Sequence, residues 1–267
     1  MNGNLLLLGL VQGITEFLPV SSSGHLALAR MFFGAGEPSL ELDLVLHAAT
    51  LLAVLIYFAR DISTLLMEWL YGFFIKNARR WDGWRFGWSV IIGVIITAPI
   101  GVLLKEFAER APRSPLLLAC GFGATSLLLI SSKFIPERGN EVSVRRGAFV
   151  GLIQGIAVMP GLSRSGSTIW AGLIAGLPRE EAFRFSFLLS VPTIVGAVIF
   201  DARDVGFGNF VYILPDGWIY GAAAAFVSGF VSLALLRRLV VSDKFWIFAI
   251  YCALLAIASL CSYLIGI

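Results

Sequence analysis

Long apolar runs dominate this sequence and decide the class of protein. A helix that crosses a bilayer needs about 20 consecutive, mostly apolar residues. Six runs approach that length, at about 42–59, 89–105, 115–132, 183–200, 218–236 and 245–265. Charged residues make up only 14 % of the 267 residues, against about 25 % in soluble domains. The composition excludes a disordered chain, a disulfide scaffold and a soluble enzyme, and it predicts an all-α integral membrane protein with six transmembrane helices.

Two further apolar segments are too short and too broken to cross. Residues 5–33 are interrupted by LPVSSSG, and residues 147–177 by PGLSRSG. A break inside a bilayer leaves backbone N–H and C=O groups unpaired, so it persists only where protein or a wet cavity covers it. We therefore predict two re-entrant helix–loop–helix hairpins, each of which enters and leaves on one side of the membrane.

Residues 62–75 differ from the six runs because charged residues interrupt their apolar pattern. The apolar residues recur at helical spacing, which predicts an amphipathic helix lying in the membrane interface.

Basic residues segregate to one side of this arrangement. Of the 20 Lys and Arg residues, 14 fall in the connections 59–87, 133–146, 178–184 and 237–244, and five fall on the other side. Because cytoplasmic loops carry the excess of Lys and Arg, the side with 14 is predicted to be cytoplasmic. Both termini then lie outside, the first hairpin opens to the outside and the second opens to the cytoplasm.

The sequence contains an internal repeat. Residues 9–25, GLVQGITEFLPVSSSGH, align without gaps on residues 151–167, GLIQGIAVMPGLSRSGS, with eight of 17 positions identical. Each half, 1–135 and 143–267, then holds one hairpin and three crossings within a single membrane domain. Because three is odd, the second half is inverted relative to the first, as in many transporters.

The two breaks differ in their reactive groups. Glu16, Ser22 and His25 belong to the first and Arg164 to the second, and ionisable groups inside a membrane are functional candidates by default. Ser22 and His25 are three residues apart and share a helix face. A hydroxyl beside an imidazole, with a carboxylate to orient the base, makes an activated nucleophile, and Arg suits a bidentate grip on phosphate. We predict a phosphate site in which these four residues are catalytic.

After each break a helix is predicted to start, and the hydroxyls and backbone N–H groups at these two helix starts can also bind the phosphate. The predicted phosphate-binding residues there are Ser21, Ser23, Ser163, Ser165 and Thr168. Three alternatives stay open at this point. Arg164 forms a structural ion pair with Glu16, His25 is a hydrogen-bonded core histidine, and His47 has a buried hydrogen-bonding role or supports the site.

Three segments carry a resemblance to a known family. QGITEFLPVSSSGH at 12–25 and PGLSRSGST at 160–168 resemble the two signature motifs of the undecaprenyl-diphosphate phosphatases, also called bacitracin-resistance proteins. FSFLLSVP at 185–192 is similar to a third family segment. The likeness covers the whole chain in length and motif spacing, and the family's functional Ser, His and Arg fall on Ser22, His25 and Arg164.

The resemblance implies a hydrolase of the bacterial inner membrane with its active site on the outer side. Such enzymes remove the terminal phosphate from undecaprenyl diphosphate, and the monophosphate carrier lipid is reused in peptidoglycan synthesis. Bacitracin acts by binding the substrate. The other partners expected are membrane lipids and a second copy of the chain as a homodimer, and no nucleic acid is expected.

The resemblance also implies help from a divalent cation, Mg²⁺ or Ca²⁺, with Glu16 as its protein ligand. The family's first motif has Glu or Gln, three residues, then Glu, which here are Gln12 and Glu16. We place Gln12 with the phosphate-binding residues because it cannot ionise. The lipid phosphates would then supply most of the cation's oxygens, as Mg²⁺ sites allow.

A second function from a different class is a transporter or flippase of polyprenyl phosphate that uses the same inverted-repeat phosphate site. The discriminating feature is the Ser22–His25 pair. A carrier of an anionic headgroup needs Arg and N–H donors, but it needs no nucleophile and base.

The predicted topology can be tested by cysteine labelling after the three native cysteines have been replaced by alanine. A membrane-impermeant thiol reagent should label a cysteine placed at Gly36 from outside, and one placed at Asn140 only from the cytoplasm. The opposite pattern would overturn the assignment made from the basic residues.

Overall fold

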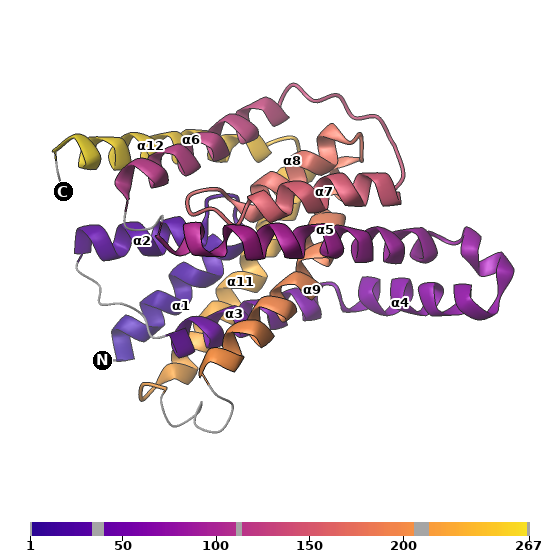
Figure 1. The fold of residues 1–267 in the computed structure, drawn as a ribbon, viewed down its shortest axis with the longest axis horizontal. Helices are drawn as coiled ribbons and strands as arrows, with labels where there is room; N and C mark the ends of the chain where they lie inside the picture. Colours follow the sequence, from indigo (N-terminus) through magenta and orange to yellow (C-terminus); the bar gives the residue numbers. More distant parts are fainter. Residues whose placement is uncertain (1, 34–39, 111–113, 206–213, 266–267) are drawn as a thin grey trace.

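A computed structural model describes residues 2–33, 40–110, 114–205 and 214–265, and it is helical in every regular element of these ranges (Figure 1). Gly36 lies outside the described residues. The helices are α1 Asn2–Phe17, α2 Ser22–Phe33, α3 Leu40–Tyr57, α4 Ala59–Phe74, α5 Asp82–Arg110, α6 Pro115–Ser132, α7 Val144–Ile156, α8 Arg164–Ile174, α9 Arg179–Val205, α11 Trp218–Val241 and α12 Phe248–Ile265, with short 3₁₀ turns η1 Lys76–Arg80 and η3 Phe245–Ile247.

The described helices account for five of the six predicted crossings. Five of them are long and apolar enough to span a membrane, at Asp82–Ala108, Pro115–Ser132, Arg179–Phe200, Trp218–Val241 and Phe245–Ile265. The remaining predicted crossing, 42–59, is α3. It reaches the length of a span only together with α4, from which it is bent by 72°. The described residues therefore contain five candidate spans, or six if the bent pair counts as one.

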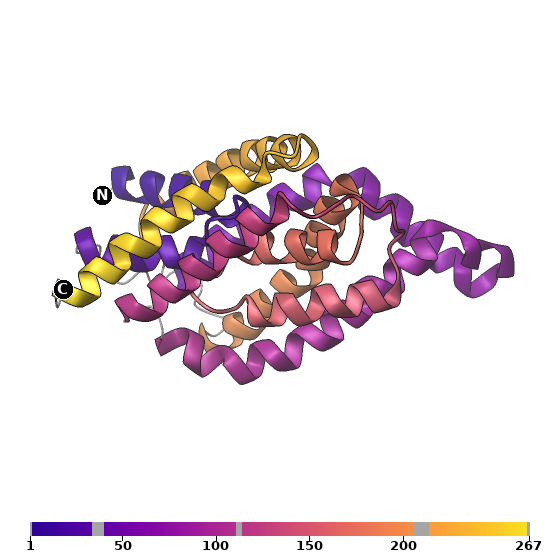
Figure 2. The same cartoon turned by 90° about the horizontal axis from the view of Figure 1, so that it is seen from above.

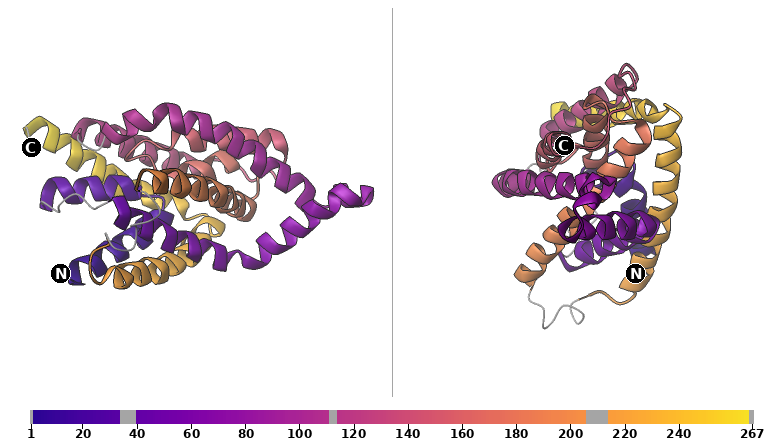
Figure 3. Two further views of the ribbon diagram at one scale, coloured as in Figure 1. Left: turned by 60° about the horizontal axis from the view of Figure 1, so that its bottom comes forward. Right: turned by 90° about the vertical axis from the view of Figure 1, so that its right-hand side faces the viewer.

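Both predicted hairpins form, and each break falls inside its predicted segment. The first hairpin is α1 and α2 with residues 18–21 between them, and the second is α7 and α8 with residues 157–163 between them. Figure 1 shows the first hairpin open toward the end where both termini lie and the second open toward the opposite end. The left panel of Figure 3 also places N and C at one end. The two breaks meet in the middle of the bundle.

The most extensive helix pairings run across the two halves of the sequence. α1 packs most extensively on α11, and α7 packs most extensively on α5. The aligned glycines Gly9 and Gly151 make both contacts close. A Cβ at Gly9 would lie 2.1 Å from the carbonyl oxygen of Gly221, and one at Gly151 would lie 2.4 Å from that of Gly93. Each hairpin is thus held by a long helix of the other half.

Ion pairs join the four connections that carry most of the basic residues. Arg85 pairs with Glu141, Arg184 with Asp61, Arg179 with Asp243 and Arg237 with Glu180. These contacts link 59–87 to 133–146 and to 178–184, and they link 178–184 to 237–244. The connections predicted to share one side therefore do lie at one end of the molecule.

The segment predicted as an interfacial helix is α4, which packs against the start of α5. Trp69 and Phe73 of α4 meet Trp84 and Trp88 of α5 edge-on or tilted. Figure 2 shows this helical hairpin projecting beyond the rest of the bundle. Its position in a membrane remains a prediction.

The close approach of α1 to α11 can be tested with a matched pair of glycine substitutions. Gly9→Ala should lower the free energy of unfolding by about 1–3 kcal/mol, because two backbones must separate to admit the methyl group. In Gly123→Ala the nearest atom is 4.0 Å from the new Cβ, so that variant should be neutral or slightly stabilised. Thermal unfolding in detergent measures both, and equal effects would contradict the packing described.

Candidate active site

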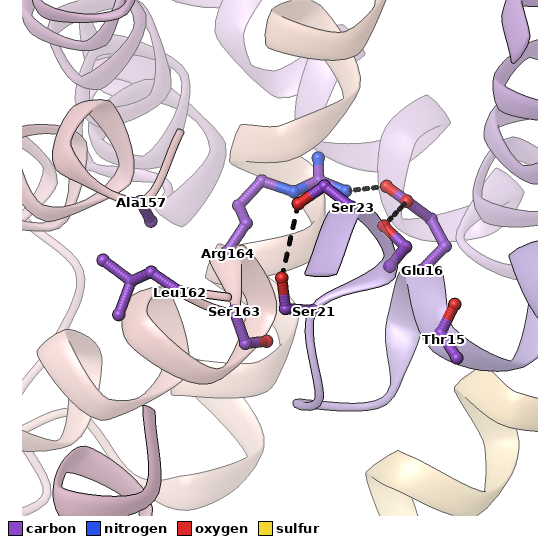
Figure 4. A pocket seen from close by; sticks show the side chains of 9 residues that line it. Thr15, Glu16, Ser21, Ser23, Ala157, Leu162, Ser163 and Arg164 are labelled. Carbon is purple, nitrogen blue, oxygen red and sulfur yellow. Dashed lines mark hydrogen bonds and ion pairs between the residues drawn. The ribbon is translucent and has the colours of Figure 1, made fainter. Parts of the chain in front are cut away.

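A pocket forms where the two breaks meet, and polar groups from both halves line it (Figure 4). The lining residues are Thr15, Glu16, Ser21, Ser22, Ser23, Ala157, Leu162, Ser163 and Arg164. The end of α1 supplies Glu16, the start of α2 supplies Ser22, and the start of α8 supplies Arg164. The pocket is therefore built from one helix C-terminus and two helix N-termini, and at the N-termini backbone N–H groups lack partners within their own helices.

The carboxylate of Glu16 is the centre of the polar contacts. Its Oε1 accepts a charged hydrogen bond from the Arg164 guanidinium, and its Oε2 accepts from the Ser22 hydroxyl at 2.8 Å and the Gln12 amide at 3.1 Å. Figure 4 shows the Arg164 side chain extended across the pocket toward Glu16. The Glu16 side chain is only 6 % exposed, against 22 % for Arg164. A carboxylate this buried requires the compensating charge.

Serine hydroxyls hold the two breaks in shape. Ser21 has φ of +67°, a left-handed conformation that is uncommon for a residue other than glycine. Its hydroxyl accepts from the backbone N–H of Gly24 at 3.3 Å and from that of Gly161 at 3.1 Å, so it joins the first break to the second. Ser163 caps α8 by accepting from the N–H of Gly166 at 3.1 Å.

Not every predicted phosphate-binding residue reaches the pocket. Ser21, Ser23 and Ser163 line it, whereas the side chains of Gln12, Ser165 and Thr168 serve their neighbours. Gln12 donates to Glu16, Ser165 contacts the Ser163 hydroxyl at 3.2 Å, and Thr168 donates to the carbonyl of Arg164 at 2.8 Å. These three residues support the site from behind.

The structure does not bring His25 to Glu16, so the predicted arrangement of Ser22, His25 and Glu16 is wrong in this respect. His25 Nδ1 lies 2.7 Å from the carbonyl oxygen of Ser21, and Nε2 lies 2.7 Å from the hydroxyl of Tyr251. A carbonyl only accepts, so Nδ1 carries the proton, and in the neutral ring Nε2 accepts from Tyr251. The physical reason is the left-handed turn at Ser21, which aims its carbonyl at the ring. The three-residue spacing could not reveal that turn.

Three residues from other helices complete the site. His47 of α3 places Nε2 3.8 Å from Glu16 Oε2, and its Nδ1 bonds the carbonyl of Asp43 at 2.8 Å. The side chain is 39 % exposed, so the prediction of hydrogen bonding is confirmed and that of burial is wrong. Thr125 of α6 donates to the carbonyl of Gly161 at 2.8 Å and accepts from the N–H of Ser163 at 2.9 Å. Nothing in the sequence pattern pointed to Thr125, or to Tyr251 on α12.

The donor set of the pocket does not fit a protein-held divalent cation. In the described part of the chain, no group of three or more His, Cys, Asp or Glu side chains could hold a metal ion. Glu16 is the one carboxylate in the pocket lining, and the Arg164 cation already neutralises it. Gln12 adds a buried amide oxygen without a recorded partner, but one carboxylate and one amide beside a guanidinium are too few for Mg²⁺ or Ca²⁺.

Comparisons with known proteins agree on one family. The family model of the bacitracin resistance protein BacA matches residues 5–258. The chain is 40 % identical over 258 residues to the undecaprenyl-diphosphatase of Desulfosudis oleivorans, which covers 93 % of both chains. It is 40 % identical to that of Treponema denticola over 92 % of this chain and 91 % of the relative, and 36 % identical to undecaprenyl-diphosphatase 1 of Shouchella clausii over 94 % and 92 %. This chain therefore belongs to the bacitracin resistance protein BacA family.

Proposed function

We propose that this protein hydrolyses undecaprenyl diphosphate to undecaprenyl phosphate and inorganic phosphate. The observation that carries the proposal is the Ser22 hydroxyl, held 2.8 Å from a buried carboxylate and facing the same pocket as Arg164. Curated relatives named undecaprenyl-diphosphatase match nearly the whole chain. The reaction recycles a lipid carrier for peptidoglycan synthesis, and bacitracin resistance follows because the reaction consumes the lipid that bacitracin binds.

The chemistry starts at Ser22. Its oxygen attacks the terminal phosphorus, the bond from that phosphorus to the bridging oxygen breaks, and undecaprenyl phosphate leaves. The hydroxyl proton passes to Glu16 Oε2, with which it already shares a hydrogen bond. Water then attacks the phosphoserine, the bond from the phosphorus to the Ser22 oxygen breaks, that oxygen takes a proton from the attacking water, and phosphate departs.

Arg164 exchanges partners during this cycle. Without substrate its guanidinium pairs with Glu16. With substrate, the planar fork turns to the phosphate oxygens and stabilises the charge that develops there. Release from Arg164 leaves the Glu16 carboxylate free to accept the proton that Ser22 must lose. The ion pair and the phosphate clamp are then two states of the same side chain.

The two halves of the chain form an inverted repeat in the bacterial inner membrane. The ion-paired basic end faces the cytoplasm, both termini lie outside, and the pocket opens to the outer side. The opposite openings of the two hairpins and the cross-half pairing of α1 with α11 and α7 with α5 support this arrangement.

Two further expectations concern ions and partners. A divalent cation, Mg²⁺ or Ca²⁺, arrives with the diphosphate and is held by the phosphate oxygens, because the donor set of the pocket does not fit one. No step above depends on it. The chain works among membrane lipids and forms a homodimer. The alternative of a polyprenyl-phosphate transporter is not favoured, because a carrier has no use for a serine hydroxyl held by a buried base.

Purified protein in detergent tests the function, because detergent abolishes transport but not hydrolysis. The wild type should release phosphate from undecaprenyl diphosphate. Arg164→Lys should lose on the order of 10²–10³ in rate although the charge is kept, because a point charge cannot reproduce the fork. Near-normal turnover of the Arg164→Lys variant would show that Arg164 is only a structural partner of Glu16. If the wild type released no phosphate from undecaprenyl diphosphate, the proposed function would be refuted.

The nucleophile can be identified from the covalent adduct. Rapid quench during turnover should trap an acid-stable phosphate on Ser22, and Ser22→Ala should abolish both the adduct and most of the activity. His25→Ala should also be impaired, because the Ser21 turn loses its ring contact, yet any adduct it forms should still be on Ser22. An acid-labile phosphate on His25 in the wild type would reverse the assignment.

A further inference from the structure

His47 touches the active site but has no part in the steps above. Its Nε2 lies 3.8 Å from Glu16 Oε2, the same oxygen that accepts from Ser22. The Glu16 side chain is 6 % exposed and the His47 side chain is 39 % exposed. The ring therefore stands between a buried carboxylate and the surroundings of the molecule.

The hydrogen bonds of His47 determine where a proton can go. Nδ1 bonds the backbone carbonyl of Asp43 at 2.8 Å, and because a carbonyl only accepts, Nδ1 carries a proton. In the neutral ring Nε2 is then an unprotonated acceptor that faces a carboxylate oxygen, also an acceptor. His47 Nε2 and Glu16 Oε2 are both acceptors and lie 3.8 Å apart, so they make no hydrogen bond. A proton added to either atom would allow a hydrogen bond between them.

Hydrolysis supplies that proton. The reaction of the proposed function consumes water and releases one proton near neutral pH, and in its first step the Ser22 proton moves to Glu16 Oε2. Arg164 cannot accept a proton, and the Gln12 amide does not titrate. Among the side chains recorded around Glu16 in the described ranges, the neutral ring of His47 is the one with an unprotonated nitrogen that can accept this proton.

We propose that His47 is the proton exit of this active site. The inference rests on the proposed function and adds a route to it. The O–H bond at Glu16 Oε2 breaks, an N–H bond forms at His47 Nε2, and the resulting imidazolium, briefly paired with the restored carboxylate, passes its proton to water. His47 acts through Glu16 and does not touch the phosphate. Closing the gap of 3.8 Å requires a shift of about 1 Å, because the hydrogen bond between these atoms has a length of about 2.7–2.9 Å.

Three substitutions separate this role from a structural one. His47→Ala removes the ring. His47→Asn keeps a short N–H donor near Nδ1 for the Asp43 carbonyl but has no proton acceptor like Nε2. His47→Gln places a neutral amide toward Glu16. Leu52→Ala, on the same helix with a side chain that is 50 % exposed, is the matched control.

The assay is phosphate release from undecaprenyl diphosphate by the full chain in detergent, with free imidazole as the probe. All three His47 variants should lose about 10- to 100-fold in kcat, below the range typical of a direct general base, with KM within about twofold of the wild type. Imidazole should restore His47→Ala several-fold, because the His47 side chain that it replaces is 39 % exposed. The wild type and Leu52→Ala should not respond.

Three outcomes would contradict the proposal that His47 carries the proton out of the site. They are a wild-type kcat in His47→Ala, a wild-type kcat in His47→Asn, and a lowered kcat in His47→Ala that imidazole does not raise. The second would show that the ring serves only to hold α3 through Asp43. Size-exclusion and thermal-unfolding profiles identify a variant that has lost its fold, in which case His47→Gln decides. An inactive wild type would instead refute the proposed function, so the two failures are distinct.

Discussion

The ion pair between Glu16 and Arg164 is the contact on which the rest of this molecule depends. Each charge lies at a helix end beside the break of an apolar hairpin, and each alone would be costly to keep away from water. Paired, they neutralise one another and place the Ser22 hydroxyl against a carboxylate. Because one charge comes from each half of the repeat, the pair also fixes how the two hairpins meet. The same contact thus serves stability without substrate and chemistry with it.

The breaks survive because small polar side chains take over the hydrogen bonding that the helices give up. The hydroxyl of Ser21 accepts N–H groups from both breaks, and the hydroxyl of Thr125 bonds both Gly161 and Ser163. Non-helical backbone at membrane depth is tolerated only with such cover. The hydroxyls that resemble an anion site in the sequence are therefore divided between two tasks. Ser23 and Ser22 face the pocket, while Thr168 and Ser165 hold the backbone behind it.

Much of the fold could be predicted from local pattern, whereas the site could be predicted only in part. Five crossings and both hairpins follow from run length and from the two polar breaks, and the common end of the basic connections follows from charge count. For Arg164 and Glu16 the sequence predicted both a catalytic role in a phosphate site and, as an alternative, a structural ion pair. The misplaced residue is His25, because spacing along one helix says nothing of Tyr251 on α12 or of the turn at Ser21. His47 reaches Glu16 from a helix outside the breaks, and no periodicity within a segment encodes such a meeting.

The packing of α1 on α11 has a consequence for how the protein is made. Helix α11 begins at Trp218, about 200 residues after the helix it must cover, and the glycine contact at Gly9 cannot exist before both are in the membrane. Contacts that are so distant in sequence form late. For most of its synthesis the first hairpin therefore lacks the helix on which α1 packs most extensively. A nascent chain that stops before α11 holds every residue of the pocket lining, yet in the described ranges α1 then has only its smaller contacts with α2 and α3 and the contacts between the two breaks to hold it.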